Sequence, residues 1–210
     1  MHLSPTLIIN AYSKGIFPMA ASRNSDEINW FNPDPRGVLP LNAFRISRSL
    51  QRSIKKENYN IKVNECFHGT IDACADRPTT WINNEIKDVY VRLHKMGYAH
   101  SLEVWENDHL IGGIYGVALG AVFFGESMFS RRSNASKIAL AYLIDRLNQS
   151  GFKLFEIQYL TSHLASLGAV EISQSLYYNL LNEALNLKTD FLQPSTPSAQ
   201  ELVHRITQIS

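Results

Sequence analysis

One carboxylate in this sequence is unusual because of the residues around it. The neighbours of Glu126 are Phe123, Phe124, Met128 and Phe129. An acid in such an aromatic setting is costly to bury unless a cation or a hydrogen-bond donor meets it. Five of the chain's eleven glycines fall between residues 112 and 125, and glycine lets backbone approach a ligand closely. We therefore expect residues 112–137 to form a pocket wall that touches a ligand.

A second polar pair lies in the apolar run KLFEIQY, which is typical of a strand. Side chains alternate across a strand, so Glu156 and Gln158 share one face while the apolar residues point to the other. The two polar groups can hydrogen-bond each other and present one oxygen outward. A polar sheet face in contact with solvent explains the same pattern equally well.

Other chemical motifs are weak in this chain. His163 stands alone and is more typical of a structural histidine, and no Ser-His-Asp arrangement can be assembled. The GGIYG run is neither a Walker loop nor a dinucleotide fingerprint, because no helix follows it. Cys66 and Cys74 match no metal spacing, which predicts reduced, buried thiols in a cytosolic protein.

A cationic helix face is predicted near residue 50. Ser47 can cap a helix over Arg48–Glu57. Spacings of four, three and four place a set of cations on one side of it. The set consists of Arg48, Arg52, Lys55 and Lys56. Such a face is either simply solvated or a stripe that contacts phosphates.

Composition limits the remaining possibilities. A chain of 210 residues that is 45% apolar suits one large domain, or a domain with a small appendage. The net charge of +1 creates no global basic field, so any nucleic acid must bind a local patch. No run is apolar over the roughly 18 residues of a membrane helix, and the first residues do not resemble a secretory signal.

The elements that must position these groups follow from periodicity and caps. We predict a strand at 38–41, a three-stranded meander at 99–106, 110–118 and 121–129, and a strand at 153–159. Helices are predicted at 7–14, 48–57, 64–74, 84–96, 135–148 and 174–187. From residue 189 the chain is rich in Pro, Ser and Thr, which favours a surface tail.

Nine short blocks appear in one order along the chain. They are GIFP (15–18), PDPR (33–36), ISRS (46–49), TWI (80–82), HSLEVW (100–105), GGIYGV (112–117), GESMFS (125–130), NASK (134–137) and SLGA (166–169). In these blocks the chain closely resembles the leucyl/phenylalanyl-tRNA–protein transferases of bacteria. The resemblance covers roughly residues 3–185.

The resemblance implies an α+β fold like that of the GCN5-related acyltransferases (GNAT-like), with a mixed sheet flanked by helices. It implies a small, shortened N-terminal portion over 1–32, a catalytic domain over 33–190 and a C-terminal tail over 191–210. The implied activity moves Leu or Phe, and less readily Met, from aminoacyl-tRNA to proteins that begin with Arg or Lys. The product feeds the N-degron pathway in the cytoplasm, without metal or coenzyme, and a monomer is the default.

The family's site residues carry over by position. Glu156 would orient Gln158, which accepts a hydrogen bond from the attacking amine, and Glu126 would pair with the acceptor's Arg or Lys side chain. The aminoacyl slot would be lined by Ile114, Phe123, Met128, Leu143 and Leu147, although plain core packing remains open for each. Trp81 would stack the terminal adenine, and the face made by Arg48, Arg52, Lys55 and Lys56 would bind the tRNA backbone.

Two residues depart from the family pattern. The family usually has Asp where this chain has Glu156, and commonly has Trp at the position of Met19. Trp30 or Phe31 could replace the lost stacking surface. Two further functions stay open: a protein that binds tRNA without catalysis, and a transferase with another acceptor, such as Asp or Glu N-termini or a small amine. Like-charge repulsion from Glu126 argues against acidic acceptors.

Overall fold

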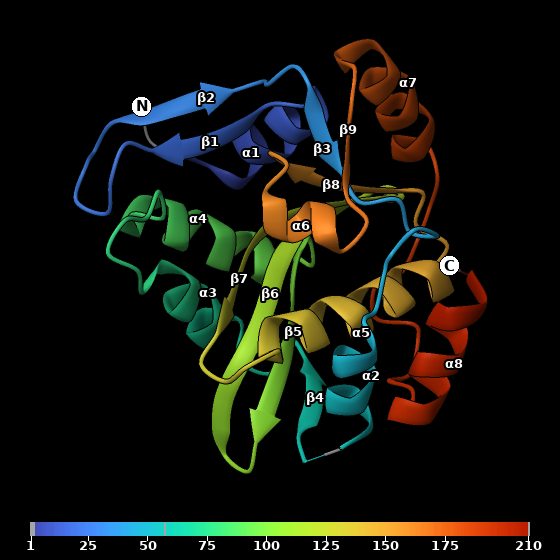
Figure 1. Cartoon of the computed structure of the whole chain (residues 1–210). Coiled ribbons are helices and arrows are strands. Elements are labelled where there is room, and N and C mark those ends of the chain that lie inside the picture. Colours follow the sequence, from blue (N-terminus) through green and yellow to red (C-terminus); the bar gives the residue numbers. More distant parts are fainter. Residues whose placement is uncertain (1–2, 57, 210) are drawn as a thin grey trace.

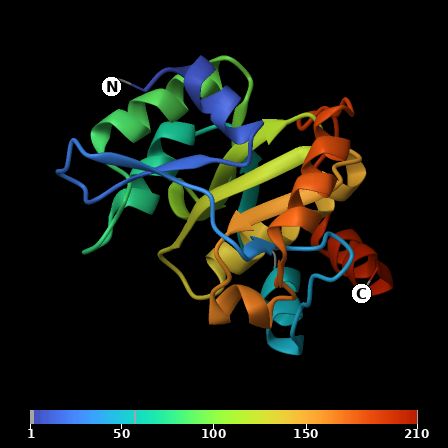
Figure 2. The same ribbon diagram turned by 90° about the horizontal axis from the view of Figure 1, so that it is seen from above.

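The protein is built on one seven-stranded sheet, with helices on both faces (Figure 1). The computed structural model describes residues 3–56 and 58–209. Strand order in the sheet is β4-β5-β6-β7-β8-β3-β9, and a separate hairpin pairs β1 with β2. Helices α3 and α4 cover one face, and α5, with α2 and α8 packed against it, covers the other (Figure 2). None of the described helices is long and apolar enough to cross a membrane.

The bounds of the elements are as follows. The strands are β1 (Phe17–Ala20), β2 (Ile28–Phe31), β3 (Arg36–Val38), β4 (Asn60–Val63), β5 (Ala99–Glu106), β6 (His109–Leu119), β7 (Val122–Ser130), β8 (Leu154–Gln158) and β9 (Val170–Ile172). The helices are α1 (Pro5–Tyr12), α2 (Arg48–Lys55), α3 (Phe67–Ala75), α4 (Asn84–Lys95), α5 (Ala135–Gln149), α6 (Ser162–Ser166), α7 (Gln174–Leu185) and α8 (Ala199–Ile209).

The long periodic elements confirm the prediction. The meander β5-β6-β7 is antiparallel throughout, and β7 then pairs in parallel with β8 through the crossover helix α5. The predicted cap at Ser47 is present, because its side chain accepts the backbone N–H of Leu50. The side chain of Asn83 caps α4 in the same way by accepting the backbone N–H of Ile86. The predicted end of the second helix at Glu57 lies outside the described residues.

The C-terminal residues do not form the predicted surface tail. Phe191 is buried and stacks on Phe123 at 5.5 Å between ring centroids. Helix α8 then packs on α2 and α5 and places Leu202 in the core. The Pro-rich stretch before it is therefore a connection between buried segments. The sequence pattern failed here because α8 is amphipathic and short, so its apolar side is visible only once its partners are known.

An opening in the sheet lies between β7 and β8. The two strands pair only over Val122–Phe124 of β7 and residues 154–156 of β8. Beyond this point β7 continues to Ser130 along β6, while β8 ends at Gln158 and pairs on its other side with β3. The strands thus separate near Gly125, and the open end leaves room for a site.

Two glycines of the predicted ligand wall, Gly112 and Gly116, pack against other parts of the fold. A Cβ on Gly112 would lie 2.5 Å from Cβ of Ala135 at the start of α5. A Cβ on Gly116 would lie 2.2 Å from the Phe124 carbonyl oxygen. These glycines therefore permit close packing of helix on sheet and of β6 on β7, and their function is structural.

Candidate active site

A cavity of about 570 Å³ lies at the open end between β7 and β8. Its buried end presents Glu126 and Gln158, and its rim carries charged and aromatic side chains from three segments. Those rim residues include Asp76, Arg77, Trp81, Arg131, Tyr159 and His163. His163, which the sequence analysis took for a structural histidine, thus lines the cavity. Burial and Lys137 lower the pKa of His163, so the imidazole remains neutral at pH 7.

Glu126 is buried and surrounded by hydrogen-bond donors. Tyr12 from α1 donates to Oε1 at 2.5 Å, and Tyr90 from α4 donates to Oε2 at 3.0 Å. The Gln158 amide nitrogen lies 3.4 Å from both oxygens. The side chain is 8% exposed and faces the cavity. A negative charge here is stabilised by dipoles only, because in the described residues no cation pairs with it.

The protonation of Glu126 follows from this arrangement. Burial raises its pKa from 4.5 to about 7, and the hydrogen bonds from Tyr12 and Tyr90 partly oppose that rise. The two phenol oxygens also lie 2.5 Å apart. When both phenols donate to the carboxylate, no proton remains for the contact between the two phenols, and protonation of the carboxyl supplies the missing one. Near neutral pH the free site therefore exchanges a proton readily.

Glu156 and Gln158 meet, but not as two neighbouring side chains of a regular strand. Glu156 Oε1 accepts the Gln158 backbone N–H at 2.8 Å. Gln158 has φ of +65°, a conformation that is strained for a residue with a side chain, and this turns its amide toward Glu126. Both residues are buried, at 0% and 7% exposed, so the solvent-facing alternative is wrong.

Arg36 neutralises Glu156. Its Nη1 lies 3.1 Å from Glu156 Oε1 in a fully buried ion pair. Its Nη2 donates to the Gly15 carbonyl at 2.6 Å, and its guanidinium lies 4.3 Å from the centre of the Tyr177 ring. Burial raises the pKa of Glu156 to about 7, and Arg36 opposes that rise. The pair holds the turn at Gln158 in place.

The structure separates the five predicted aminoacyl-pocket residues. Met128 lines the cavity. Ile114, Phe123, Leu143 and Leu147 are buried in the core between the sheet and α5, and none of them lines the cavity. In the structure these four residues pack in the core, which is the alternative that the sequence analysis left open. The apolar cavity wall is instead Met128 with Phe129, Ile157 and Leu164.

The two tryptophans predicted to contact the terminal adenine, Trp81 and Trp30, also differ in position. Trp81 is half-buried in the loop before α4 and lines the cavity, as does Met19 from β1. Trp30 lies on β2, is 38% exposed and does not line the cavity. Of the predicted adenine contacts, only Trp81 is therefore placed at the site.

The predicted cationic face is solvent-exposed. Leu50 and Ile54 of α2 are buried, while the four cations Arg48, Arg52, Lys55 and Lys56 are all exposed. Asn134 donates to Ser53 at 3.0 Å, which joins α2 to the loop between β7 and α5. The face thus lies next to a loop that borders the cavity.

Sequence reasoning missed Tyr12, Tyr90, Arg36, Arg77 and Arg131. Tyr12 and Tyr90 occupy apolar positions of their helices, where periodicity predicts only core packing. A buried tyrosine still needs a hydrogen-bond partner for its hydroxyl. That requirement could have indicated a buried polar site near these two residues. Arg36 had a signal too, because this cation directly precedes the largely apolar run GVLPL.

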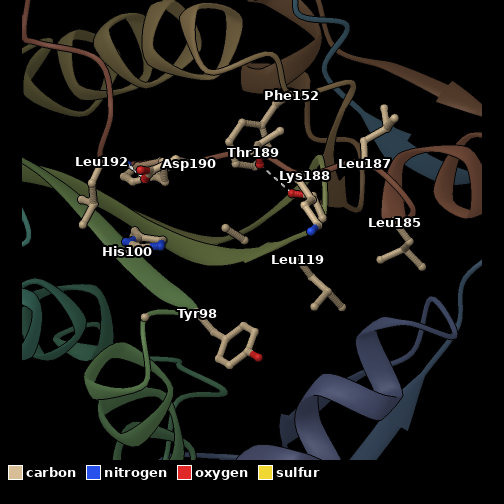
Figure 3. Close-up of a pocket in the computed structure, with 14 residues that line it drawn as sticks. Tyr98, His100, Leu119, Phe152, Leu185, Leu187, Lys188, Thr189, Asp190 and Leu192 are labelled. Atoms are coloured by element: carbon tan, nitrogen blue, oxygen red, sulfur yellow. Dashed lines mark hydrogen bonds between the residues drawn. The ribbon is translucent and has the colours of Figure 1, made fainter.

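A second cavity, of about 540 Å³, lies at the other end of the strands (Figure 3). Tyr98 and His100 at the start of β5 face Leu119 and the segment after α7 across it. Thr189 closes one side by donating to the Gly120 carbonyl at 2.6 Å. Burial lowers the pKa of His100 to about 4, so the imidazole is neutral.

The chain matches known proteins along most of its length. The profile described as leucyl/phenylalanyl-tRNA protein transferase matches residues 38–182, and that of its N-terminal domain matches 1–34. Leucyl/phenylalanyl-tRNA–protein transferases of Ruegeria sp. and Roseobacter denitrificans are 56% and 55% identical over 210 residues, covering all of each chain. The structure of L-PGS from Bacillus licheniformis overlaps 74% of this chain and 53% of its own, with 12% identity and a TM-score of 0.43.

The sequence matches define the class: the protein is an aminoacyltransferase, an enzyme that moves an aminoacyl group from tRNA to protein. Within that class the chain belongs to the leucyl/phenylalanyl-tRNA–protein transferase family. The resemblance drawn from the nine sequence blocks is confirmed.

Proposed function

We propose that this enzyme transfers Leu or Phe, and less readily Met, to the N-terminal α-amine of proteins that begin with Arg or Lys. The products would then enter the bacterial N-degron pathway. One observation carries the proposal: a buried carboxylate, Glu126, lines a cavity in a chain of this family, and no cation of the described residues pairs with it. A cationic acceptor supplies the missing partner.

Glu126 receives the acceptor's cation. A free carboxyl with a pKa of about 7 is partly protonated at neutral pH. An incoming ammonium or guanidinium favours the carboxylate, so binding is coupled to loss of the carboxyl proton. Asp or Glu at the acceptor N-terminus would be repelled, which agrees with a basic N-terminal residue.

Gln158 positions the nucleophile. Its amide nitrogen is assigned to Glu126 because carboxylate oxygens accept hydrogen bonds, so its amide oxygen is left to accept from the α-amine. The amine nitrogen forms a bond to the ester carbonyl carbon, the ester C–O bond breaks, and the ribose oxygen leaves and takes a proton. Because the ester is already activated, positioning and charge stabilisation supply most of the catalysis.

The donor occupies the rest of the cavity. The apolar aminoacyl side chain packs on Met128, Phe129 and Ile157, which accept Leu, Phe and Met but separate them weakly. Trp81 stacks the terminal adenine. The exposed face of Arg48, Arg52, Lys55 and Lys56 binds the acceptor-stem backbone by charge.

The wider setting is part of the same proposal. The separation of the parallel pair β7-β8 supports a GNAT-like fold over residues 33–190, with 1–32 as the N-terminal portion. Cys66 and Cys74 are free thiols, and free thiols are compatible with a cytoplasmic enzyme. Cys74 is buried as predicted, whereas Cys66 is only half-buried.

A transfer assay tests the proposal. Purified protein with radiolabelled leucyl-tRNA should label a peptide that begins with Arg or Lys, and should leave a peptide that begins with Glu unlabelled. Labelling of the Glu peptide alone would show a different acceptor class. Binding of tRNA without labelling of any peptide in an array of first residues would show a binding protein instead.

A further inference from the structure

We propose that Arg77 and Arg131 form an anion site at the rim of the cavity that binds the phosphodiester groups at the 3′ end of the donor RNA. This inference rests on the proposed function. It adds a second RNA contact to the one assigned to α2, and it concerns the last nucleotides of the donor and not the acceptor stem.

The two arginines lie along one edge of the cavity. Both line it, Arg77 from the loop between α3 and α4 and Arg131 from the end of β7. Arg77 Nη2 donates to the Met128 carbonyl oxygen on β7. Met128 and Arg131 are three extended residues apart, which is about 10 Å. The Arg131 guanidinium lies 5.5 Å from the centre of the Phe129 ring, so both cations follow the same open stretch of strand.

Both guanidinium groups are held in place by uncharged partners. Arg77 also lies 3.4 Å from the Ser127 hydroxyl, and Arg131 Nη1 donates to the Leu110 carbonyl at 3.2 Å. Arg23 fixes the backbone of the Arg77 loop, because its Nη2 donates to the carbonyls of Ala75 and Arg77 at 2.7 and 2.8 Å. A guanidinium has five N–H donors, so several remain for a ligand.

Neither charge is neutralised within the described part of the chain. The arginines in ion pairs there are Arg36, Arg132 and Arg205, each with a carboxylate about 3.1 Å away or less. No carboxylate makes such a pair with Arg77 or Arg131. A guanidinium is a planar fork of donors that can bind two oxygens of one phosphate group, so two ordered and unpaired arginines at one cavity suit phosphate groups.

The position of the pair fits the donor and not the acceptor. The proposed acceptor carries a cation of its own, which Arg77 and Arg131 repel toward Glu126. Trp81 lies four residues after Arg77 in the same loop, so a base stacked on it places its 5′ phosphate near Arg77. The hydrogen bond from Asn134 to Ser53 joins the Arg131 loop to α2. RNA that leaves the α2 face therefore meets Arg131 and then Arg77.

Two donors separate this role from a structural one. We compare leucyl-tRNA with 3′-O-leucyl-adenosine, which has no phosphate, for the wild type, Arg77→Gln, Arg131→Gln and the control Arg132→Gln. Arg132 is the next residue, is 66% exposed and pairs with Glu106. Each cavity variant should lower kcat/KM for leucyl-tRNA about tenfold. Each should also reduce the salt slope by about 0.7, the value for one single-strand phosphate contact.

The same variants should use leucyl-adenosine as well as the wild type does, which also shows that they are folded. Equal losses with both donors, no loss with leucyl-tRNA, or a matching loss in Arg132→Gln would each overturn the anion site. If the wild type transfers Leu and the cavity variants transfer it equally well from leucyl-tRNA, this inference alone is overturned. A wild type that transfers from neither donor overturns the proposed function and this inference with it.

Discussion

The cavity at Glu126 and the cavity at His100 lie at opposite ends of the same strands. Their volumes are similar, about 570 and 540 Å³. At the first, β7 and β8 separate, and a carboxylate and an amide lie buried with one side open to the cavity. At the second, the chain turns between β6 and β7, and two of the polar side chains are paired: Asn64 donates to His100 at 3.0 Å, and Thr189 donates to Gly120.

The difference between them is one of charge and not of space. Burial leaves His100 neutral, with a pKa of about 4, so this buried histidine does not change state near pH 7. Burial raises the pKa of Glu126 to about 7, so this buried carboxyl does. A cavity of this size is common, whereas a buried acid without a cationic partner is maintained at a cost.

The largest effect should come from replacing the buried polar pair. Glu126→Gln and Gln158→Ala should each lower the rate of Leu transfer about 100-fold or more, because a preorganised contact to the reacting groups is lost. Thr189→Val at the second cavity is the matched control and should leave transfer unchanged. The rate of single-turnover transfer from leucyl-tRNA to a peptide that begins with Arg is the measurement for all three variants. A comparable loss in Thr189→Val would remove the distinction between the cavities.

Glu126 should lower the free energy of unfolding, and this loss of stability should grow as pH rises. Its pKa is 4.5 in a model compound and about 7 in the fold, so the folded state binds the extra proton and becomes less stable between these values as pH increases. Glu126→Gln should therefore stabilise the protein by about 3 kcal/mol at pH 8 and by much less at pH 4.5. Urea unfolding at the two pH values measures this. An equal gain at both would contradict the raised pKa.

Charge reversal on α2 should weaken RNA binding without affecting chemistry at the cavity. Arg48→Glu with Arg52→Glu should lower the affinity for leucyl-tRNA roughly 10- to 100-fold and reduce its salt dependence. Lys95→Glu with Lys188→Glu makes the same charge change on exposed residues away from α2, one of them at the second cavity. If this control loses as much affinity, the effect is one of net charge and the face is not a binding site.

The smallest effect should be a shift in pH dependence. The hydrogen bond from Tyr90 lowers the pKa of Glu126, so Tyr90→Phe should raise it and move the acidic limb of kcat/KM to higher pH by up to about one unit. The acceptor amine titrates near pH 8 and is the same for both proteins. An unmoved acidic limb in Tyr90→Phe would assign that limb to another group.

The sequence predicted those parts of the fold that are long and periodic. The meander β5-β6-β7 and helix α5 follow from alternation and from spacings of three and four residues. The strand predicted at 38–41 begins and ends earlier in the structure, as β3 (Arg36–Val38), and β9 was not predicted. Each has three residues, too few for a periodic pattern, and β3 joins β9 to β8 at the edge of the sheet. Their existence is a property of the tertiary structure.

The candidate site was predicted in the same uneven way. Glu126, Glu156 and Gln158 were found because a polar residue in an apolar run is conspicuous. Tyr12 and Arg36 were missed because their partners are 114 and 120 residues away. The aminoacyl slot was placed on residues that the structure buries beneath the sheet, since sequence position does not say which face of a strand opens to a cavity.

The distance along the chain between Arg36 and Glu156 has a consequence for synthesis. Strand β3 enters the sheet beside β8, and Tyr12 reaches Glu126 on β7. A nascent chain therefore carries Arg36 without Glu156 until about three quarters of it has been made, and Tyr12 without Glu126 until about three fifths has been made. Every shorter product lacks the paired site, so a ribosome that stalls early releases an inactive fragment. Such a fragment exposes an unpaired arginine and an unpaired strand edge, which makes it a target for quality control.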